Sequence, residues 1–261
     1  MMNAPKKSLG QHWLHDLASL RAMADAAHVG PDDEVLEIGP GLGTLTAELA
    51  DRAKHVTCVE FDPELAEGLA ARVPAANVTV VHQDILKFDL TKLPKDYKVA
   101  ANLPYYITSK IVRMLLESPN PPQETALLVQ KEVAERMAAK PGDMSILAIA
   151  VQYYAEPTLG PVVLAELFTP PPKVDSQIIG LKRREKQLFD DVETDDFFAV
   201  IRAGFSEKRK TIRNSLSGGL HLEKTVTEEL LAAAKVDPKT RAEDLGLEDW
   251  HRLTKTYVGM V

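Results

Sequence analysis

The sequence has a single cysteine and no hydrophobic run long enough to cross a membrane. Cys58 has no partner in the chain for a disulfide, and its place in the strand-like run 56–61 predicts a buried structural thiol. The longest apolar runs, such as residues 146–151, are far shorter than the roughly 20 residues of a spanning helix. No apolar segment of the kind found in secretion signals follows Lys6 and Lys7. We therefore expect a cytoplasmic protein without a membrane partner.

An excess of basic residues is also missing, because 38 Asp and Glu outnumber 31 Lys and Arg and give a formal net charge of −7. This balance argues against a protein that coats nucleic acid indiscriminately. The exception is the stretch 202–213, which holds one acid and five basic residues, namely Arg202, Lys208, Arg209, Lys210 and Arg213. Such a run is usually a solvated helix face. It indicates phosphate contacts only if the rest of the chain calls for a polyanion.

Strand-like and helix-like patterns alternate to about residue 185, which is typical of an α/β fold built on a parallel sheet. From Gln187 onward only amphipathic helical patterns follow. We therefore expect an α/β domain at 1–185 and a small all-helical domain at 186–261. The expected strands cover residues 34–38, 55–60, 77–81, 97–103, 125–129, 159–164 and 176–182. The expected helices cover 17–27, 63–73, 109–116, 131–139, 145–154, 195–205, 208–216, 223–234 and 248–258, with a further helix after residue 44.

A glycine-rich turn follows the first expected strand. Gly39, Gly41 and Gly43 would let the backbone approach a ligand closely and direct N–H groups at it from the start of a helix. The spacing G-x-G-x-G differs from the dinucleotide fingerprint, because Thr44 stands where the third glycine would be. The turn alone is a weak indication of a nucleotide-like ligand.

Polar residues also end the following strands. Glu60, Asp84 and Asn102 come at or just after three of them. The carboxyl ends of parallel strands share one edge of a sheet, so these side chains should meet the glycine turn in one crevice. An acid at the position of Glu60 can bind both ribose hydroxyls, whereas a solvated strand-end acid is the plain alternative.

The segment Asn102-Leu103-Pro104-Tyr105 indicates a clamp for a planar amine. Pro104 cannot donate to a strand ladder, and the residue before a proline is held extended, so the direction of Asn102 is fixed. The Asn102 carbonyl can accept a hydrogen bond from an amino group, and Tyr105 offers a face to a base. By itself the tetrapeptide is more often a strand end with a packed tyrosine. The proline-rich loop 168–176 is stiff and should hold Phe168 and Lys173 in fixed places.

These motifs, in this order and spacing, resemble the ribosomal RNA adenine dimethyltransferases over essentially the whole chain. The resemblance is strongest to the bacterial small-subunit branch, which dimethylates two adjacent adenosines in the 3′-terminal hairpin loop of the RNA. It implies a Rossmann-like methyltransferase sheet that uses S-adenosylmethionine, a helical RNA-binding domain, a monomer and no metal. The matching segments are 6–11, 37–43, Glu60, 83–84, 102–105, 168–176 and 209–214.

The resemblance also implies roles for individual residues. Cofactor contacts fall on His12, Leu14, Gly39, Gly41, Glu60, Asp84, Ile85 and Asn102. Asn102 and the Pro104 carbonyl would accept hydrogen bonds from the adenine amine, while Tyr105 and Phe168 stack on the base. Candidate RNA contacts are Lys6, Lys7, Lys110, Arg113, Lys173, Lys208, Arg209, Lys210 and Arg213. The family usually has Asn-Phe where this chain has His12-Trp13, so the contact at position 12 would come from the imidazole or the backbone.

Three other readings remain open at this point. The large-subunit RNA dimethyltransferases of the macrolide-resistance type commonly have Asn-Ile-Pro-Tyr, and tend to have Asn where this chain has Asp175. A nicotinamide-dependent oxidoreductase is disfavoured by Thr44 and by the amine clamp. A non-catalytic RNA-binding assembly factor would tolerate the loss of Asn102 or Glu60, and both are present.

Overall fold

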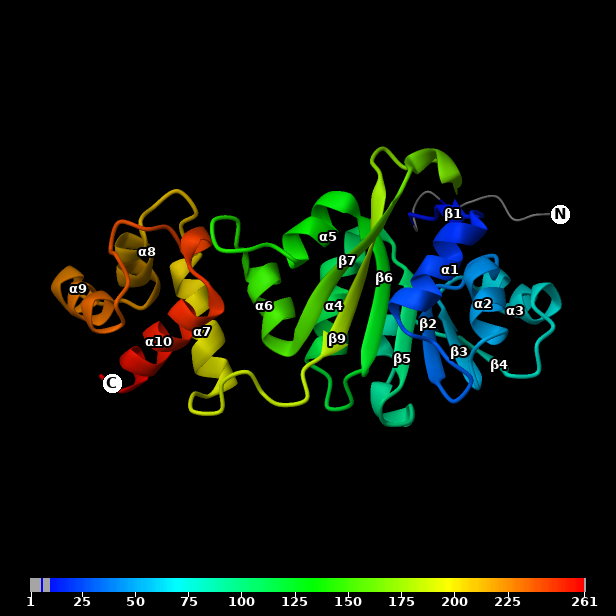
Figure 1. Cartoon of the computed structure of the whole chain (residues 1–261), viewed down its shortest axis with the longest axis horizontal. Coiled ribbons are helices and arrows are strands. Elements are labelled where there is room, and N and C mark those ends of the chain that lie inside the picture. Colours follow the sequence, from blue (N-terminus) through cyan, green and yellow to red (C-terminus); the bar gives the residue numbers. More distant parts are fainter. Residues whose placement is uncertain (1–5, 7–9, 261) are drawn as a thin grey trace. The chain divides into compact units, whose positions relative to one another are not determined.

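The computed structural model of the chain describes residues 6 and 10–260, so the expected RNA contact Lys7 lies outside the described residues. The described residues form a seven-stranded sheet in the order β4-β3-β2-β5-β6-β9-β7 (Figure 1). Its parallel strands are β2 (Glu34–Ile38), β3 (His55–Glu60), β4 (Val78–His82), β5 (Lys98–Asn102) and β6 (Glu124–Gln130). β9 (Ser176–Arg183) pairs antiparallel with β6 and with β7 (Ala155–Val163). The short strands β1 (Trp13–Leu14) and β8 (Phe168–Thr169) pair with each other.

The helices follow the expected order. Figure 1 shows α1 in front of the sheet and α4 behind it, and α1 packs on β5, β6, β7 and β9. The α-helices are α1 (Leu17–Ala26), α2 (Thr44–Ala50), α3 (Pro63–Arg72), α4 (Thr108–Leu116), α5 (Lys131–Met137), α6 (Ile146–Tyr154), α7 (Thr194–Gly204), α8 (Ile212–Gly219), α9 (Lys224–Ala233) and α10 (Leu247–Val258). Short 3₁₀ helices cover Ile85–Lys87, Leu90–Lys92, Tyr105–Ile107, Ala165–Leu167 and Ala242–Asp244. None of the described helices is long and apolar enough to cross a membrane.

Two elements differ from the expectation. The helix expected at 208–216 begins only at Ile212, whose N–H donates to Thr240 O at 2.7 Å, while Lys210 N closes a turn on Glu207 O. The strand expected at 159–164 begins earlier, at Ala155. It is the edge strand of the sheet, where Pro157 is tolerated because its missing N–H is not needed by a further strand.

The strand order places a switch in direction between β2 and β5. From β2 the chain builds outward through β3 to β4, and then returns to add β5 and β6 on the other side. Loops that leave the carboxyl ends of β2 and β5 therefore diverge and leave a crevice, which is the usual ligand site of such sheets. The glycine turn follows β2 and the Asn102 segment ends β5, so the fold brings the two predicted motifs to this crevice.

The chain divides into two compact units. Residues up to 135 together with 155–183 form the first unit, and residues 136–154 with 184–261 form the second. The expected division at residue 185 places 136–154 with the sheet, whereas the structure groups this segment with the C-terminal helices. The reason is the apolar side of α6, where Ile149 and Tyr153 are buried in one cluster with Phe197 and Val200. The rings of Tyr153 and Phe197 stack with centroids 4.9 Å apart.

Candidate active site at the carboxyl edge of the sheet

A cavity of about 330 Å³ lies at the carboxyl ends of β2, β3 and β5. Its volume is in the range of small-molecule sites, about 300–1,000 Å³. The lining includes every predicted cofactor contact and most of the predicted clamp: His12, Leu14, Gly39, Gly41, Glu60, Asp84, Ile85, Asn102, Pro104 and Tyr105. Residues brought together here are as far apart in the chain as His12 and Tyr105. The sequence-based convergence of the strand ends is therefore found in the structure.

The glycine turn after β2 requires glycine for two different reasons. Gly39 and Gly43 have φ values of +68° and +88°, which side chains rarely adopt. A Cβ at Gly43 would also lie 2.6 Å from Val73 Cγ2 and 2.8 Å from Leu69 Cδ1, so this glycine allows α3 to pack close. A Cβ at Gly39 would meet nothing within 4 Å. The backbone at Gly39 is therefore open to a ligand in the cavity.

Glu60 is held by the backbone on both carboxylate oxygens. Oε2 accepts the N–H of Gly41 at 3.0 Å, and Oε1 accepts the N–H of Asp62 at 2.9 Å. The residue is buried, and burial raises its pKa while these backbone hydrogen bonds act in the opposite direction. Each oxygen can accept a second hydrogen bond, so a ribose diol could use both. Glu60 is thus not a solvated strand-end acid.

A buried acid and the cysteine lie beneath the turn. The Cys58 thiol donates to Glu37 Oε2 at 3.3 Å, and both side chains are essentially inaccessible. Burial raises the pKa of Glu37 to about 7, against the hydrogen bond from the Cys58 thiol. Burial and the neighbouring Glu37 raise the pKa of the Cys58 thiol as well. The expectation of a buried structural cysteine is confirmed.

Asp84 lies just beyond β4 and begins the 3₁₀ helix Ile85–Lys87. One of its oxygens, Oδ1, accepts the N–H of Leu86 at 3.0 Å. The preceding residue is tied to the neighbouring strand, because Gln83 N donates to Glu60 O at 2.9 Å. Asp84 is therefore fixed at the cavity with its second oxygen uninvolved in the helix cap.

The amide of Asn102 has a defined orientation. Its Nδ2 donates to the backbone carbonyl of His12 at 3.0 Å. A carbonyl oxygen only accepts hydrogen bonds, so the NH₂ group must be at that end of the amide and Oδ1 at the other. Among the described residues, no hydrogen bond engages Oδ1. Asn102 therefore presents a free acceptor in the lining of the cavity.

Tyr105 and His12 support each other beside this acceptor. The Tyr105 hydroxyl hydrogen-bonds Ser176 Oγ at 2.8 Å, and burial raises its pKa. The imidazole of His12 stacks on the Tyr105 ring with centroids 5.9 Å apart and an angle of 19°. His12 Nδ1 lies 2.7 Å from Pro170 O, so this nitrogen carries a proton. At position 12, then, the backbone fixes Asn102 and the imidazole fixes Tyr105.

Two predicted clamp residues lie differently from the expectation. Phe168 is 3% exposed, pairs with Leu14 between β8 and β1, and belongs to the hydrophobic core rather than to the cavity lining. The Pro104 carbonyl already accepts Ile107 N at 3.2 Å and Thr108 Oγ1 at 3.3 Å. Both hydrogen bonds close the turn after β5. The acceptor with the clearest opening to the cavity is Asn102.

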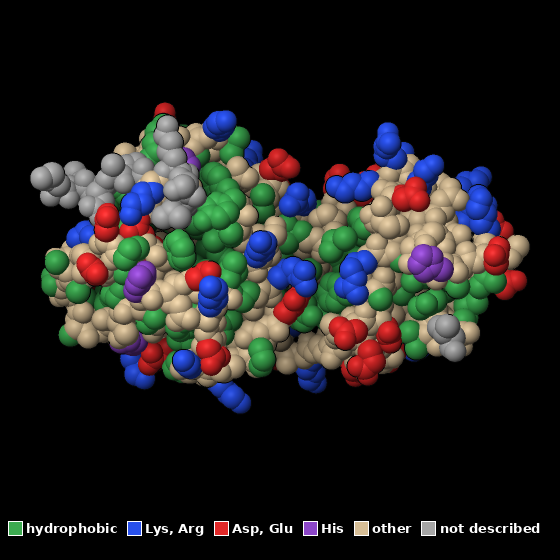
Figure 2. All heavy atoms as spheres, turned by 180° about the vertical axis from the view of Figure 1, so that it is seen from behind, with side chains coloured by type: hydrophobic (Ala, Val, Ile, Leu, Met, Phe, Trp, Pro, Cys, Tyr) green, Lys and Arg blue, Asp and Glu red, His purple; other side chains and the backbone are tan. Residues whose placement is uncertain are grey.

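The predicted RNA contacts fall into two groups. Lys110, Lys173, Lys208, Arg209 and Lys210 are exposed. The other described candidates have acidic partners: Lys6 pairs with Asp62, Arg113 Nε with Glu117 Oε1 at 2.9 Å, and Arg213 Nη1 with Glu228 Oε1 at 2.6 Å. Figure 2 shows Lys and Arg side chains gathered along one border of the helical unit and acidic side chains along the opposite border of that face.

Sequence reasoning missed several residues of the site. Phe61 and Tyr106 line the cavity although they are 57% and 63% exposed, and Gln11 and Trp13 line it from the N-terminal arm. Both exposed aromatics directly follow residues that were singled out, Glu60 and Tyr105. Their position in the sequence was therefore a usable signal, whereas the contribution of Gln11 depends on a tertiary contact.

Comparison with known proteins places the chain in a family. The family model for ribosomal RNA adenine dimethylase matches residues 2–258. Two curated relatives are each called ribosomal RNA small subunit methyltransferase A. The protein from Dehalococcoides mccartyi is 43% identical over 258 residues, which cover 97% of this chain and 89% of the relative. The protein from Moorella thermoacetica is 44% identical over 266 residues, with 97% and 92% coverage.

Solved structures give the same result. A 23S rRNA methyltransferase, ErmE, is 32% identical with a TM-score of 0.77 and covers 94% of this chain and 98% of its own. A dimethyladenosine transferase from Plasmodium falciparum is 28% identical with a TM-score of 0.80, covering 93% and 96%. The Rossmann-like methyltransferase fold and the resemblance inferred from the motifs are thereby confirmed. The chain belongs to the ribosomal RNA adenine dimethylase family, whose members are S-adenosylmethionine-dependent methyltransferases.

Proposed function

We propose that this protein dimethylates the N6 amines of two adjacent adenosines in the 3′-terminal hairpin loop of small-subunit ribosomal RNA. The observation that carries the proposal is the Asn102 amide, which His12 O holds with Oδ1 open to the cavity. The small-subunit target is supported by the names of the relatives at 43% and 44% identity, compared with 32% for the 23S enzyme. The enzyme would act as a monomer without metal, in the cytoplasm, on the assembling small subunit.

The residues of the cavity fit S-adenosylmethionine. The backbone-held carboxylate of Glu60 suits the two ribose hydroxyls, and the uncapped oxygen of Asp84 suits the adenine amine. The open backbone at Gly39 leaves room beside them. His12, Leu14, Gly41 and Ile85 complete the proposed contacts. When bound, this group supplies an electrophilic methyl.

The acceptor side works mainly by positioning. The exocyclic amine of adenine is a poor nucleophile because its lone pair is delocalised into the ring, so a well-placed acceptor that favours the pyramidal amine lowers the barrier. Asn102 Oδ1 is that acceptor, and Tyr105 gives the base a face. The Pro104 carbonyl could assist only by giving up one of its turn hydrogen bonds, and Phe168 would support the site from the core. After methyl transfer, the cationic amine of the product loses one N–H proton to water.

Such a site requires a base that is outside a helix stack. Unpaired loop nucleotides meet this condition at low cost, which agrees with a hairpin-loop target. The exposed Lys110, Lys173, Lys208, Arg209 and Lys210 would bind the surrounding phosphates, and residues 186–261 would form the RNA-binding domain. Arg113 and Arg213 would have to share their charge with Glu117 and Glu228.

The proposal is tested on ribosomal RNA from cells that lack the gene. Mass spectrometry should show the loss of two neighbouring dimethyladenosines from the small-subunit RNA, and the wild-type gene should restore both. The gene for Asn102→Ala should restore neither in full. Loss of dimethyladenosine from the large-subunit RNA alone would favour the macrolide-resistance type of activity, and unchanged RNA would contradict both.

The phosphate contacts of the helical unit are tested separately. Replacing Arg209 and Lys210 with Gln should flatten the slope of log affinity against log salt by roughly 1.4 to 1.8, as expected for two lost phosphate contacts. The matched control carries Lys224→Gln and Lys239→Gln, which remove the same charge from other exposed sites of this unit. Equal slopes for both variants and wild type would mean that Arg209 and Lys210 are only solvated.

A further inference from the structure

The N-terminal arm, whose described residues are 6 and 10–14, forms one wall of the cavity. Residues 10–14 all line it, and His12 and Leu14 are held there by hydrogen bonds from uncharged side chains. Asn102 Nδ2 donates to His12 O at 3.0 Å, and Thr44 Oγ1 donates to Leu14 O at 2.9 Å. The pairing of β1 with β8 adds to these contacts. The position of the arm therefore determines whether the cavity is closed on this side.

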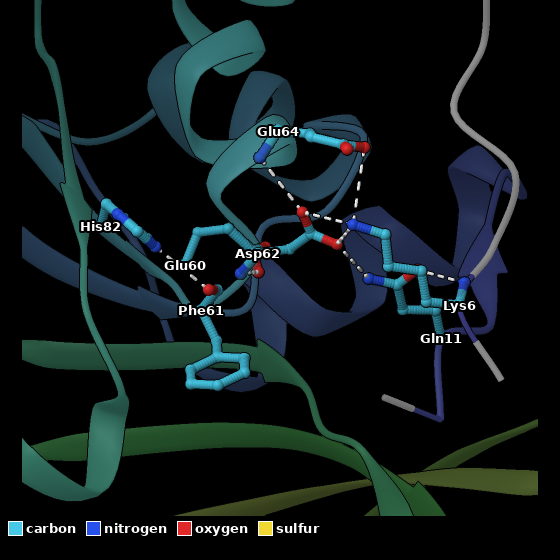
Figure 3. Close-up of polar contacts among 7 residues, drawn as sticks. All are labelled: Lys6, Gln11, Glu60, Phe61, Asp62, Glu64 and His82. Carbon is cyan, nitrogen blue, oxygen red and sulfur yellow. Dashed lines mark hydrogen bonds and ion pairs between the residues drawn. The ribbon is translucent and has the colours of Figure 1, made fainter. Parts of the chain in front are cut away.

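At Lys6 and Gln11, by contrast, the arm is bound to a charged group, the carboxylate of Asp62. Lys6 Nζ lies 2.9 Å from Asp62 Oδ2 and 3.1 Å from Oδ1, and Gln11 Nε2 donates to Oδ2 at 3.4 Å (Figure 3). Gln11 Oε1 in turn accepts the backbone N–H of Lys6 at 2.7 Å. Lys6 Nζ is also 3.5 Å from Glu64 Oε2. Lys6 and Gln11 thus both bind the carboxylate of Asp62.

Asp62 connects this contact to the predicted ribose site. Its backbone N–H donates to Glu60 Oε1 at 2.9 Å, and its Oδ1 caps α3 by accepting Glu64 N at 3.1 Å. The Asp62 side chain is only 2% exposed, while that of Lys6 is 41% exposed. A buried carboxylate is costly unless it is paired, so the Lys6 ammonium satisfies a charge that water does not reach.

We propose that Asp62 is a positioning residue that fastens the N-terminal arm across the cofactor cavity through Lys6 and Gln11. By keeping this wall in place, the contact should slow the release of a bound cofactor. Lys6 then serves the cofactor site and is not an RNA contact while the arm is fastened. The inference rests on the proposed cofactor site, but the arm contact exists without a ligand and can be tested without one.

Two variants remove the ion pair from opposite sides. Asp62→Asn keeps an oxygen for the cap of α3, where Asn is as good as Asp, and removes the charge. Lys6→Met keeps the aliphatic stem and removes the ammonium. The control is Lys54→Met, which breaks the 3.1 Å ion pair with Glu34 elsewhere in the same unit.

The first measurement is acrylamide quenching of Trp13 fluorescence in the ligand-free protein. Trp13 is half-buried in the cavity wall, and the other tryptophan, Trp250, is fully buried in the helical unit. A Trp13→Phe variant gives the Trp250 background. Quenching of Trp13 should increase in Asp62→Asn and in Lys6→Met, and not in Lys54→Met.

The second measurement is the stopped-flow dissociation rate of S-adenosylmethionine. Both variants should release it about three- to thirtyfold faster, and the double variant should be no faster than either single one, because the two changes remove one contact. Unchanged quenching and release in Lys6→Met, which alters only a half-exposed side chain, would overturn the inference even if Asp62→Asn proved unstable. Failure of the wild type to bind S-adenosylmethionine would instead refute the proposed function, and the quenching result would still decide whether Asp62 holds the arm.

Discussion

On the glycine-turn side of the cavity, Glu60 is held by backbone N–H groups from Gly41 and Asp62, which lie 19 and 2 residues away. On the clamp side, Asn102 binds His12, which is 90 residues away in the chain. Tyr105 binds Ser176, which is 71 residues away. The first side is part of the sheet and its turns. The second depends on the N-terminal arm and on the start of β9, which reach this side only in the folded protein, so substitutions of Asn102 and Tyr105 should disturb catalysis more than cofactor binding.

The largest effect is expected for Asn102→Ala. Loss of the positioned acceptor should slow methyl transfer about ten- to a thousandfold, as loss of one polar group does in other active sites. The dissociation constant of S-adenosylmethionine should change much less. Single-turnover kinetics measure the chemical step directly. Asn120→Ala is the control, since Asn120 binds the carbonyls of Leu90 and Leu93 away from the lining, and a wild-type rate in Asn102→Ala would refute the clamp.

The next effect concerns stability on the glycine-turn side, at Glu37. Its folded-state pKa of about 7 lies above the ordinary 4.5, so the folded state holds this proton more tightly than the unfolded chain. The protonated Glu37 therefore contributes about 3 kcal/mol to the free energy of unfolding below pH 4.5. This stabilisation is lost as the pH rises to about 7. Glu37→Gln should remove this loss. Urea unfolding from pH 4 to 8 would show it, with Glu34→Gln at the start of the same strand as control.

A smaller effect is expected for Glu60→Ala. Removing a charged acceptor of two ribose hydroxyls should raise the dissociation constant of S-adenosylmethionine about ten- to a hundredfold, since hydrogen bonds to charged groups contribute about 1.5–3 kcal/mol. Calorimetry measures this without catalysis. Glu67→Gln removes an exposed carboxylate from α3 and should leave binding unchanged. An unchanged constant in Glu60→Ala would move the ribose contact elsewhere.

The smallest effect is expected for Tyr105→Phe. The variant keeps the ring that stacks on His12 and loses only the 2.8 Å hydrogen bond to Ser176. A net loss of about 0.5–1.5 kcal/mol corresponds to a two- to tenfold decrease in kcat. Tyr97→Phe is the matched control, because the Tyr97 hydroxyl is buried outside the cavity lining and has no hydrogen-bond partner among the described residues. A decrease as large as that of Asn102→Ala would show that the Tyr105 hydroxyl has a direct part in the chemistry.

The same contrast explains what could be read from the sequence. Strand patterns, the glycine turn and the polar strand ends are local signals, and they placed Glu60, Asp84 and Asn102 at one cavity. The burial of Phe168 depends on pairing with the arm, and the pairing of Lys6 depends on a carboxylate 56 residues away. Contacts of this kind produce no periodic pattern in the amino-acid sequence. They emerge only when distant segments pack.

Because residues 136–154 belong to the helical unit although they precede β7 and β9 in the chain, this unit is restricted in how it can evolve. The chain enters that unit, returns to complete the sheet with β7 and β9, and then enters it again. The C-terminal helices therefore cannot be gained, lost or exchanged by recombination at one junction, because Ile149 and Tyr153 belong to their core. A protein truncated after Arg183 would expose this apolar surface, and we expect it to sediment as aggregates in analytical ultracentrifugation while the full chain stays in solution.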